Sequence, residues 1–186
     1  MTCDFLVIGA GIAGLTFAIR AAKHGLVIVL TKGSALDSNT AWAQGGLASV
    51  LPEGLRDEGD SLELHIADTL DAGAGLCKED VVRAIVSEGA ATVDDLVSHG
   101  VGFDKEGDHY QLGKEGGHSK RRILHARDTT GREIAESLVE VARATPNLTL
   151  LEDHFTIDLI TTGKLGVVTE DRVLGAYVLE LSLIHI

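Results

Sequence analysis

The stretch VIGAGIAG, residues 7–14, decides the fold. Its glycines follow the spacing G-x-G-x-x-G between an apolar run and an amphipathic segment. Gly9 allows a tight turn, Gly11 lets a pyrophosphate approach the backbone, and Gly14 lets a helix pack closely on a strand. The free N–H groups at the start of such a helix favour phosphate. The predicted dinucleotide-binding residues of this loop are Gly9, Ala10, Gly11, Ile12, Ala13 and Gly14.

The segments beside this loop predict a β-α-β unit. Residues 4–8 and 26–31 are short apolar runs typical of strands buried on both faces. Between them, residues 12–24 carry apolar side chains at helical spacing, and Gly25 ends the predicted helix. A strand, a helix and a second strand in this order form a parallel pair with a right-handed crossover. The predicted fold class is therefore α/β.

The rest of the chain predicts mixed elements. Residues 33–59 are glycine-rich and predict a loop. A capping box of Asp60 and Glu63 predicts a helix through Ala72. We further expect two helices over 79–99 broken near Gly89, a loop or hairpin over 101–117, a helix from Thr130 to about Ala144, and a β-meander beginning near 148 with strands at 148–151, 154–161 and 172–180.

One feature of an NAD-binding unit is missing. An acidic residue normally stands at the end of the second strand, where it binds the ribose hydroxyls. Thr31 and Lys32 occupy that place here. We therefore expect a hydroxyl, backbone groups or Lys32 to contact the adenosine half of the ligand.

Composition and charge exclude several classes of protein. The formal net charge of −12 argues against a general nucleic-acid binder. The sequence contains no run of about 18 apolar residues, so no membrane span is expected. Cys3 and Cys77 have no metal-ligand spacing, the histidines have none either, and two scattered thiols fit a cytoplasmic setting. Residues 114–132 hold six bases against two acids, which is either a solvated face or a local anion site.

Several ordered motifs then identify a resemblance. After the glycine loop come SNTAWAQGG (38–46), HIADTLDAGAG (65–75), GVGFD (100–104) and EGGHSKRRILHARDTTG (115–131). Together they resemble the flavoprotein family of succinate dehydrogenase, fumarate reductase and L-aspartate oxidase. The resemblance implies a Rossmann-like FAD-binding domain with a mainly parallel sheet. It also implies that residues 38–46 wrap the isoalloxazine ring, with the adjacent glycines letting the backbone pass close to it. The implied cofactor-binding residues are Lys32, Asn39, Thr40, Ala41, Trp42, Ala43, Gln44, Gly45, Gly46, Phe155 and Thr156.

Two positions separate the members of this family. Respiratory members attach FAD through a histidine just before the threonine of the loop, whereas this chain has Asn39 before Thr40. An amide cannot form that bond, so FAD is expected to be non-covalent. At Glu115 the resemblance is to L-aspartate oxidases, and a carboxylate there would orient the substrate by its ammonium group. The alternative is a loop acid paired with Lys114 or Arg121.

Other polar residues are harder to assign. Of His118, Ser119, Arg121, Arg122 and His125, we expect one or two to line the substrate cavity or support the flavin, unless KRR at 120–122 is a solvated run. His65 and Asp68 are spaced to pair on one helix face. We favour a helix held to the flavin loop by hydrogen bonds over a catalytic pair.

The resemblance implies FAD-dependent oxidation of L-aspartate to iminoaspartate, by hydride transfer from C2 to flavin N5. Oxygen or fumarate would reoxidise the flavin, and quinolinate synthase would use the product in NAD biosynthesis. The alternatives are a soluble fumarate reductase or succinate dehydrogenase relative, acting on another small dicarboxylate, and a non-catalytic dinucleotide-binding module.

Family members are far longer than 186 residues. We therefore expect residues 1–180 to be the N-terminal part of a truncated FAD-binding domain, without the capping and C-terminal helical domains. The last residues, LSLIHI (181–186), follow a strand without a turn and are expected to be a non-native tail. The catalytic residues are expected beyond residue 186, so the chain alone is expected to be inactive.

Overall fold

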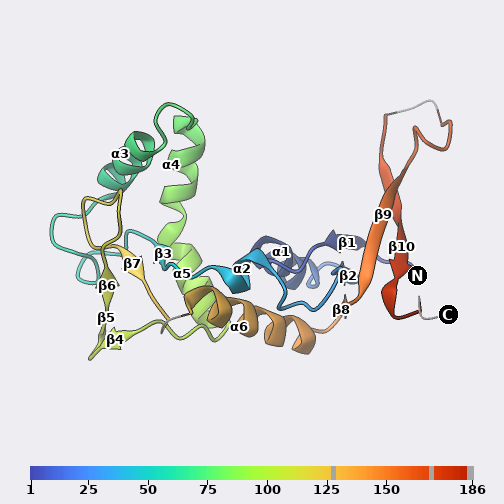
Figure 1. The fold of residues 1–186 in the computed structure, drawn as a ribbon, viewed down its shortest axis with the longest axis horizontal. Helices are drawn as coiled ribbons and strands as arrows, with labels where there is room; N and C mark the ends of the chain where they lie inside the picture. The colour runs from blue at the N-terminus through green and yellow to red at the C-terminus, as the bar shows by residue number, and fades with distance from the viewer. Residues whose placement is uncertain (127–128, 168–169, 184–186) are drawn as a thin grey trace. The chain divides into compact units, whose positions relative to one another are not determined.

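The computed structural model describes residues 1–126, 129–167 and 170–183. The chain divides into two compact units (Figure 1). Unit 1 consists of Met1–Trp42 and Ala135–Ile186, and unit 2 consists of Ala43–Ile134.

The centre of unit 1 is a parallel sheet with the strand order β1-β2-β8. Strand β1 is Phe5–Ile8, β2 is Val27–Leu30 and β8 is Leu148–Leu151. Val27 stands opposite Phe5 on one side and Leu148 on the other, so β2 is central. Its side chains Val27 and Val29 are almost completely buried, as expected of a strand covered on both faces.

Helix α1, Ile12–Ala21, joins β1 to β2 and buries Leu15, Ala18 and Ile19. The β-α-β unit is therefore confirmed, although the helix ends about one turn before the predicted His24. Helix α6, Thr130–Ala144, precedes β8 and buries Leu138, Val139 and Ala142.

The predicted β-meander is wrong in its first strand. β8 pairs in parallel with β2, because a strand that returns from a crossover helix joins the sheet in parallel. Asp153, with φ at 57°, then redirects the chain. Strands β9, His154–Thr161, and β10, Val173–Glu180, form a separate antiparallel ribbon, which a short 3-10 helix at Leu181–Leu183 follows.

Among its described residues, unit 2 contains three complete helices, the first turn of α6 and two small antiparallel sheets. The helices are α3 (Leu62–Ala72), α4 (Glu79–Ser87) and α5 (Gly89–Ser98), so the predicted break near Gly89 is confirmed. Of the loop or hairpin predicted over 101–117, the structure forms a hairpin. One sheet has the order β3-β7-β6, from Leu47–Ala48, Ile123–Leu124 and Leu112–Gly113, and the hairpin pairs β4 (Lys105–Glu106) with β5 (His109–Tyr110).

Three local predictions are corrected. The predicted loop over 33–59 contains a short helix, α2, at Asn39–Trp42, as well as β3. Asp60 does not cap α3: the Ser61 hydroxyl accepts the Leu64 N–H at 3.3 Å, because the Asp60 carboxylate is engaged with Arg122. The Thr130 hydroxyl likewise does not cap α6, since it accepts the Ala126 N–H at 3.0 Å.

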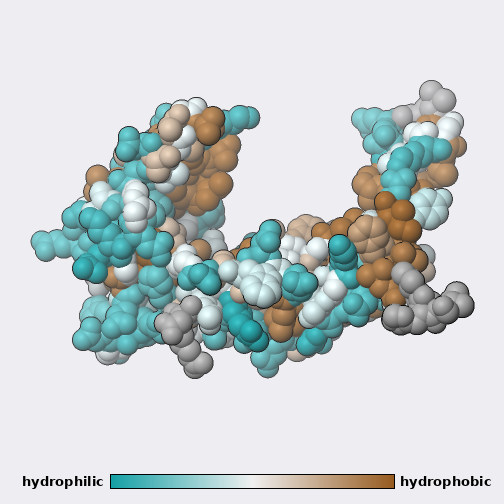
Figure 2. All heavy atoms as spheres, viewed as in Figure 1, coloured by the Kyte–Doolittle hydropathy of each residue, from teal (hydrophilic) through white to brown (hydrophobic). Residues whose placement is uncertain are grey.

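Large apolar side chains are exposed on the β9–β10 ribbon, where Figure 2 shows them beside hydrophilic residues. Contiguous apolar surface of this kind commonly marks a place where other protein packs. The exposed side chains there are Phe155, Ile157, Leu159, Val173, Leu174, Tyr177, Val178 and Leu179. None of the helices over 1–126, 129–167 and 170–183 combines the length and the apolar character needed to cross a membrane.

Candidate functional site

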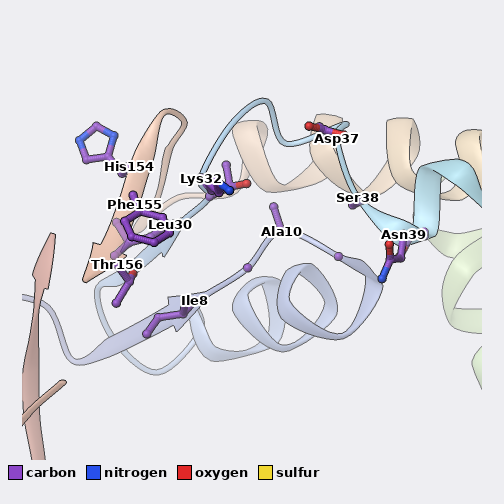
Figure 3. Close-up of a pocket in the computed structure, with 14 residues that line it drawn as sticks. Ile8, Ala10, Leu30, Lys32, Asp37, Ser38, Asn39, His154, Phe155 and Thr156 are labelled. Carbon is purple, nitrogen blue, oxygen red and sulfur yellow. The ribbon is translucent and has the colours of Figure 1, made fainter. Parts of the chain in front are cut away.

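A cavity of about 410 Å³ opens in unit 1 beyond the carboxyl ends of β1 and β2 (Figure 3). Ligands of open α/β sheets bind at this end of the strands. The lining residues come from the glycine loop, the end of β2, the segment before and within α2, and the start of β9. They are Ile8, Gly9, Ala10, Gly11, Leu30, Thr31, Lys32, Asp37, Ser38, Asn39, Thr40, His154, Phe155 and Thr156.

The glycine loop has the geometry that its sequence predicts. Gly9 has φ at +106°, a conformation that L side chains rarely adopt. A Cβ atom on Gly11 would meet only the Thr40 Oγ1, at 3.6 Å, so the loop presents backbone to open space. A Cβ atom on Gly14 would overlap the carbonyl oxygen of Gly9, so this glycine is required by the packing of α1 on the loop.

Thr40 ties helix α2 to the start of α1. Its hydroxyl accepts the Ile12 N–H at 3.0 Å. Gly11, the N-cap of α1, supplies no side-chain cap of its own. The structure thus brings the SNTAW segment beside the glycine loop, and it leaves the helix start without a charged side chain that would compete with a phosphate.

The end of the cavity formed by β2 and β9 holds Lys32, Phe155 and Thr156. The Lys32 ammonium lies 5.7 Å from the centre of the Phe155 ring. The Thr156 hydroxyl oxygen is buried without a hydrogen-bond partner among the described residues. A cation, an aromatic face and an unsatisfied hydroxyl suit the phosphates, the base and the sugar of a nucleotide, so this end of the cavity fits the adenosine half of FAD.

The lining residues that were not individually predicted to bind the cofactor include Asp37, Ser38 and His154. Asp37 accepts the Trp42 indole N–H at 3.3 Å, which links the start of the SNTAW segment to its end. Figure 3 shows Asp37 and Asn39 on one side of Ala10, and Lys32 and Phe155 on the other. The position of His154 directly before Phe155 was the signal in the sequence.

The remaining predicted flavin-loop residues belong to unit 2, and there the structure places Glu115 beside the glycine pair. Glu115 is exposed, and its Oε1 lies 3.5 Å from the Gly46 amide nitrogen, which donates to it. A Cβ atom on Gly45 would meet a Glu115 carboxylate oxygen at 3.7 Å. Within the described part of the chain, Glu115 forms no ion pair with Lys114 or Arg121.

Gly46 has a packing role that the sequence did not predict. A Cβ atom there would overlap the side chain of Ile123 and the carbonyl oxygen of Leu124, both in β7. Gly46 therefore admits a neighbouring strand of its own chain. Neither Gly45 nor Gly46 has a positive φ. Ala43, Gln44 and Gly45 are exposed, so these three remain free to contact a ligand.

The basic run 120–122 is not a solvated face throughout, because Arg122 is completely buried. Its guanidinium bonds to Asp60 and Asp68, so Arg122 lines no substrate cavity. Asp68 also accepts the Ser119 amide and hydroxyl, each at 2.8 Å. Helix α3 is thus held by hydrogen bonds to the segment 119–122. The favoured interpretation predicted such bonds to the flavin loop instead.

His65 and Asp68, whose spacing would allow them to pair, do not bond to each other in the described part of the chain. Burial, followed by the charge of Arg122, lowers the pKa of His65, whose ring lies tilted at 54° to that of His118 with 5.4 Å between the ring centroids. Burial opposes ionisation of Asp68, but the Ser119 amide and the Arg122 guanidinium outweigh it and lower the Asp68 pKa to about 2. Asp68 therefore stays ionised, and its partners are Ser119 and Arg122. Among the described residues, no three His, Cys, Asp or Glu side chains gather as metal ligands would.

The cavity at the strand ends, the tight glycine turn and a helix start with no acidic residue in its first turn define a dinucleotide-binding α/β protein. More particularly, the chain belongs to the FAD binding domain family, whose model matches residues 4–183. FAD is therefore the cofactor that this domain binds.

Curated relatives and solved structures agree with the family. The L-aspartate oxidase of Vibrio cholerae serotype O1 is 47% identical over 190 residues, covering 99% of this chain and 34% of the relative. The chloroplastic L-aspartate oxidase 2-a of Nicotiana tabacum is 47% identical over 160 residues, covering 86% and 24%. A mutant of the E. coli quinol fumarate reductase FrdA has a TM-score of 0.85 at 27% identity, covering 97% and 29%. The chain thus spans about a third of the bacterial relative's length.

Proposed function

We propose that this chain serves, as part of an L-aspartate oxidase, in the FAD-dependent oxidation of L-aspartate to iminoaspartate. The observation that carries the proposal is the exposed Glu115 carboxylate beside Gly45 and Gly46, on the segment that resembles a flavin-wrapping loop. The names of the relatives support the same activity.

Different residues of the chain hold different parts of FAD. The glycine loop and the start of α1 hold the pyrophosphate, while Lys32, Phe155 and Thr156 hold the adenosine half. Asn39 to Gly46 hold the isoalloxazine ring, which accepts a hydride at N5 when the cofactor is bound. The chain itself supplies orientation and charge.

Glu115 supplies the contact that distinguishes aspartate from succinate. The carboxylate is exposed and accepts one long hydrogen bond, from Gly46, so its other lone pairs are open to an ammonium group. An ammonium on C2 of the substrate would then fix which face of C2 presents its hydrogen. Arg122 does not bind the substrate carboxylates, because both of its edges are occupied by Asp60 and Asp68.

The rest of the proposal concerns the whole protein. We assign the binding of the substrate carboxylates and the catalytic proton transfer to the part of the longer relatives that this chain does not span. Residues 1–180 are then the N-terminal part of the FAD-binding domain. Oxygen or fumarate reoxidises the flavin, and quinolinate synthase consumes the iminoaspartate in the cytoplasm for NAD biosynthesis.

The test is Glu115→Gln in the full-length protein. Loss of one charge-assisted contact is expected to lower kcat/KM for aspartate by roughly ten- to a hundredfold. Fumarate reduction by the same variant is expected to change little, because fumarate has no ammonium group. Glu106→Gln, a matched change of an exposed glutamate on β4, is the control. Equal losses with aspartate and with fumarate would show that Glu115 is a structural loop acid.

The proposal includes non-covalent FAD, because Asn39 stands where respiratory relatives carry the linking histidine. Acid precipitation of the full-length protein is expected to release the flavin into the supernatant. Flavin fluorescence that stays with the washed pellet would contradict this part of the proposal.

A second candidate is a soluble fumarate reductase or succinate dehydrogenase type of flavoprotein. It is favoured by the structural similarity to the E. coli fumarate reductase, with its TM-score of 0.85. Turnover of succinate without turnover of aspartate would select it over the first proposal.

A further inference from the structure

Arg122 lies at the centre of a buried ion triad. Its side chain and that of Asp60 are both 0% exposed. The two bond in bidentate fashion, with Nη2 donating to Oδ1 at 2.7 Å and Nε to Oδ2 at 3.1 Å. The remaining edge of the guanidinium donates to Asp68 Oδ2 at 2.5 Å. One cation thus joins the loop before α3, helix α3 itself, and the segment that follows Glu115.

The neighbours of Arg122 are anchored to the same region. Ser119 donates to Asp68 through its amide and its hydroxyl. The Lys120 ammonium donates to the carbonyl oxygen of Glu58 at 2.7 Å. The Arg121 amide donates to the Asp57 carboxylate at 3.0 Å. Each residue of 119–122 is therefore bonded to the stretch 57–68.

Arg122 also closes the loop that carries Glu115. Its amide donates to the Gly113 carbonyl oxygen at 3.1 Å, which ties the two ends of residues 113–122 together. Inside that loop, Glu115 precedes two glycines, and Gly117 has φ at +82°. Because glycines restrict the backbone little, the position of Glu115 depends on the anchored ends of the loop.

We propose that the Asp60–Arg122–Asp68 triad is a positioning device for Glu115, which closes the loop 113–122 and so fixes where the carboxylate meets the substrate ammonium. The inference rests on the proposed function for the role of Glu115. It assigns to Asp60, Asp68 and Arg122 an effect on aspartate binding although none of them touches the substrate.

The chemistry of the triad supports positioning over simple stabilisation. Burying an arginine with two carboxylates removes three charges from water, and well-packed apolar residues commonly give equal or greater stability. A guanidinium held at both edges has one allowed orientation, because the bonds are directional. Such an arrangement specifies the course of the backbone from which Glu115 projects.

The experiment is Asp68→Asn in the full-length holoenzyme. The amide keeps the shape of the side chain and removes the charge that faces Arg122 and Ser119. We expect the KM for aspartate to rise about tenfold, with kcat and fumarate reduction changed less than about twofold. The amides of 113–122 are expected to exchange hydrogen at least about tenfold faster than in the wild type.

Two controls accompany this variant. Asp71→Asn makes the same chemical change at an exposed position on the same helix and is expected to alter neither readout. Combining Asp68→Asn with Glu115→Gln is expected to raise the aspartate KM no further than Glu115→Gln alone, since both changes remove the same contact. If Asp68→Asn does not fold, Ser119→Ala removes a single O–H contact and is expected to raise the KM about threefold.

The outcomes separate the two proposals. Additive losses in the double variant, equal losses with fumarate, or unchanged exchange at 113–122 would each overturn the positioning role. Absence of aspartate turnover in the wild type would instead remove the proposed function. Hydrogen exchange at 113–122 would then show independently whether the triad closes the loop.

Discussion

The two glycine stretches of this chain look alike in sequence and do different physical work. At Gly11 the backbone faces open space, where only the Thr40 hydroxyl would approach an added Cβ atom. At Gly46 the same space is filled by β7 of the chain itself. The first glycine keeps room for a ligand, and the second keeps room for a strand. Whether a glycine serves binding or folding is thus decided by what stands opposite it.

The largest expected effect tests whether Gly46 is needed for folding. Gly46→Ala in the full-length protein should reduce stability by about 3 kcal/mol, because the new methyl group meets the rigid backbone of Leu124. Gly45→Ala is the matched control, since its Cβ would make an ordinary contact with Glu115. Thermal unfolding of the FAD-free proteins measures both. An unchanged melting temperature for Gly46→Ala would break the comparison.

For Gly11 we expect the opposite pattern, in which FAD affinity changes and stability does not. Gly11→Ala should leave the melting temperature of the FAD-free protein nearly unchanged and raise the Kd for FAD at least tenfold, about 1.4 kcal/mol. The reason is that the methyl group projects where the pyrophosphate must approach the backbone. Flavin titration measures the affinity. A large loss of stability with unchanged FAD affinity would reverse the assignment of this glycine.

The folding of unit 2 is also expected to depend on pH, because its charged groups bond to one another. The pKa of Asp68 is lowered from 3.8 to about 2 in the fold, so the carboxylate stabilises the fold above about pH 4. That contribution is lost as the pH falls through about 2. Between about pH 5 and pH 3 the wild type should lose about 1 kcal/mol more than Asp68→Asn. Parallel denaturation curves at the two pH values check this, and identical losses would contradict it.

The smallest expected effect on stability is that of a substitution at Asp37, which lines the cavity. Trp42 is 74% exposed, and its indole makes a long, exposed contact with Asp37. Asp37→Asn should therefore change the free energy of unfolding by less than about 0.5 kcal/mol.

Trp42 belongs to the segment assigned to the flavin ring. The tryptophan fluorescence that the wild type shows in excess of Trp42→Phe should therefore be quenched when FAD is added. A difference that FAD leaves unchanged would remove Trp42 from that assignment.

The sequence predicted the parts of the fold that depend on local patterns. The glycine spacing and two apolar runs were enough for β1, α1 and β2, since buried parallel strands and helix stops are local signals. The end of α1 and the cap of α3 were misjudged. From the local sequence, Asp60 is predicted to cap the helix. Its carboxylate instead bonds to Arg122, which lies 62 residues later and is not part of the local pattern.

The candidate site divides in the same way. Lys32, Asn39, Thr40, Phe155 and Thr156 were named from the sequence, and the structure brings them to one cavity with the glycine loop. The burial of Arg122 could not be predicted. An arginine within KRR looks solvated until its distant partners are known, and single-sequence patterns carry no information on such pairs.

The division of the chain into units also has a consequence for its synthesis. Unit 2 is encoded between the two segments of unit 1, so residue 134 leaves the ribosome before β8 does. Unit 2 can therefore complete its own contacts while β2 still lacks one of its neighbours. Because domains generally fold as units during translation, we expect the inserted unit to fold first and the interrupted unit to complete its folding afterwards.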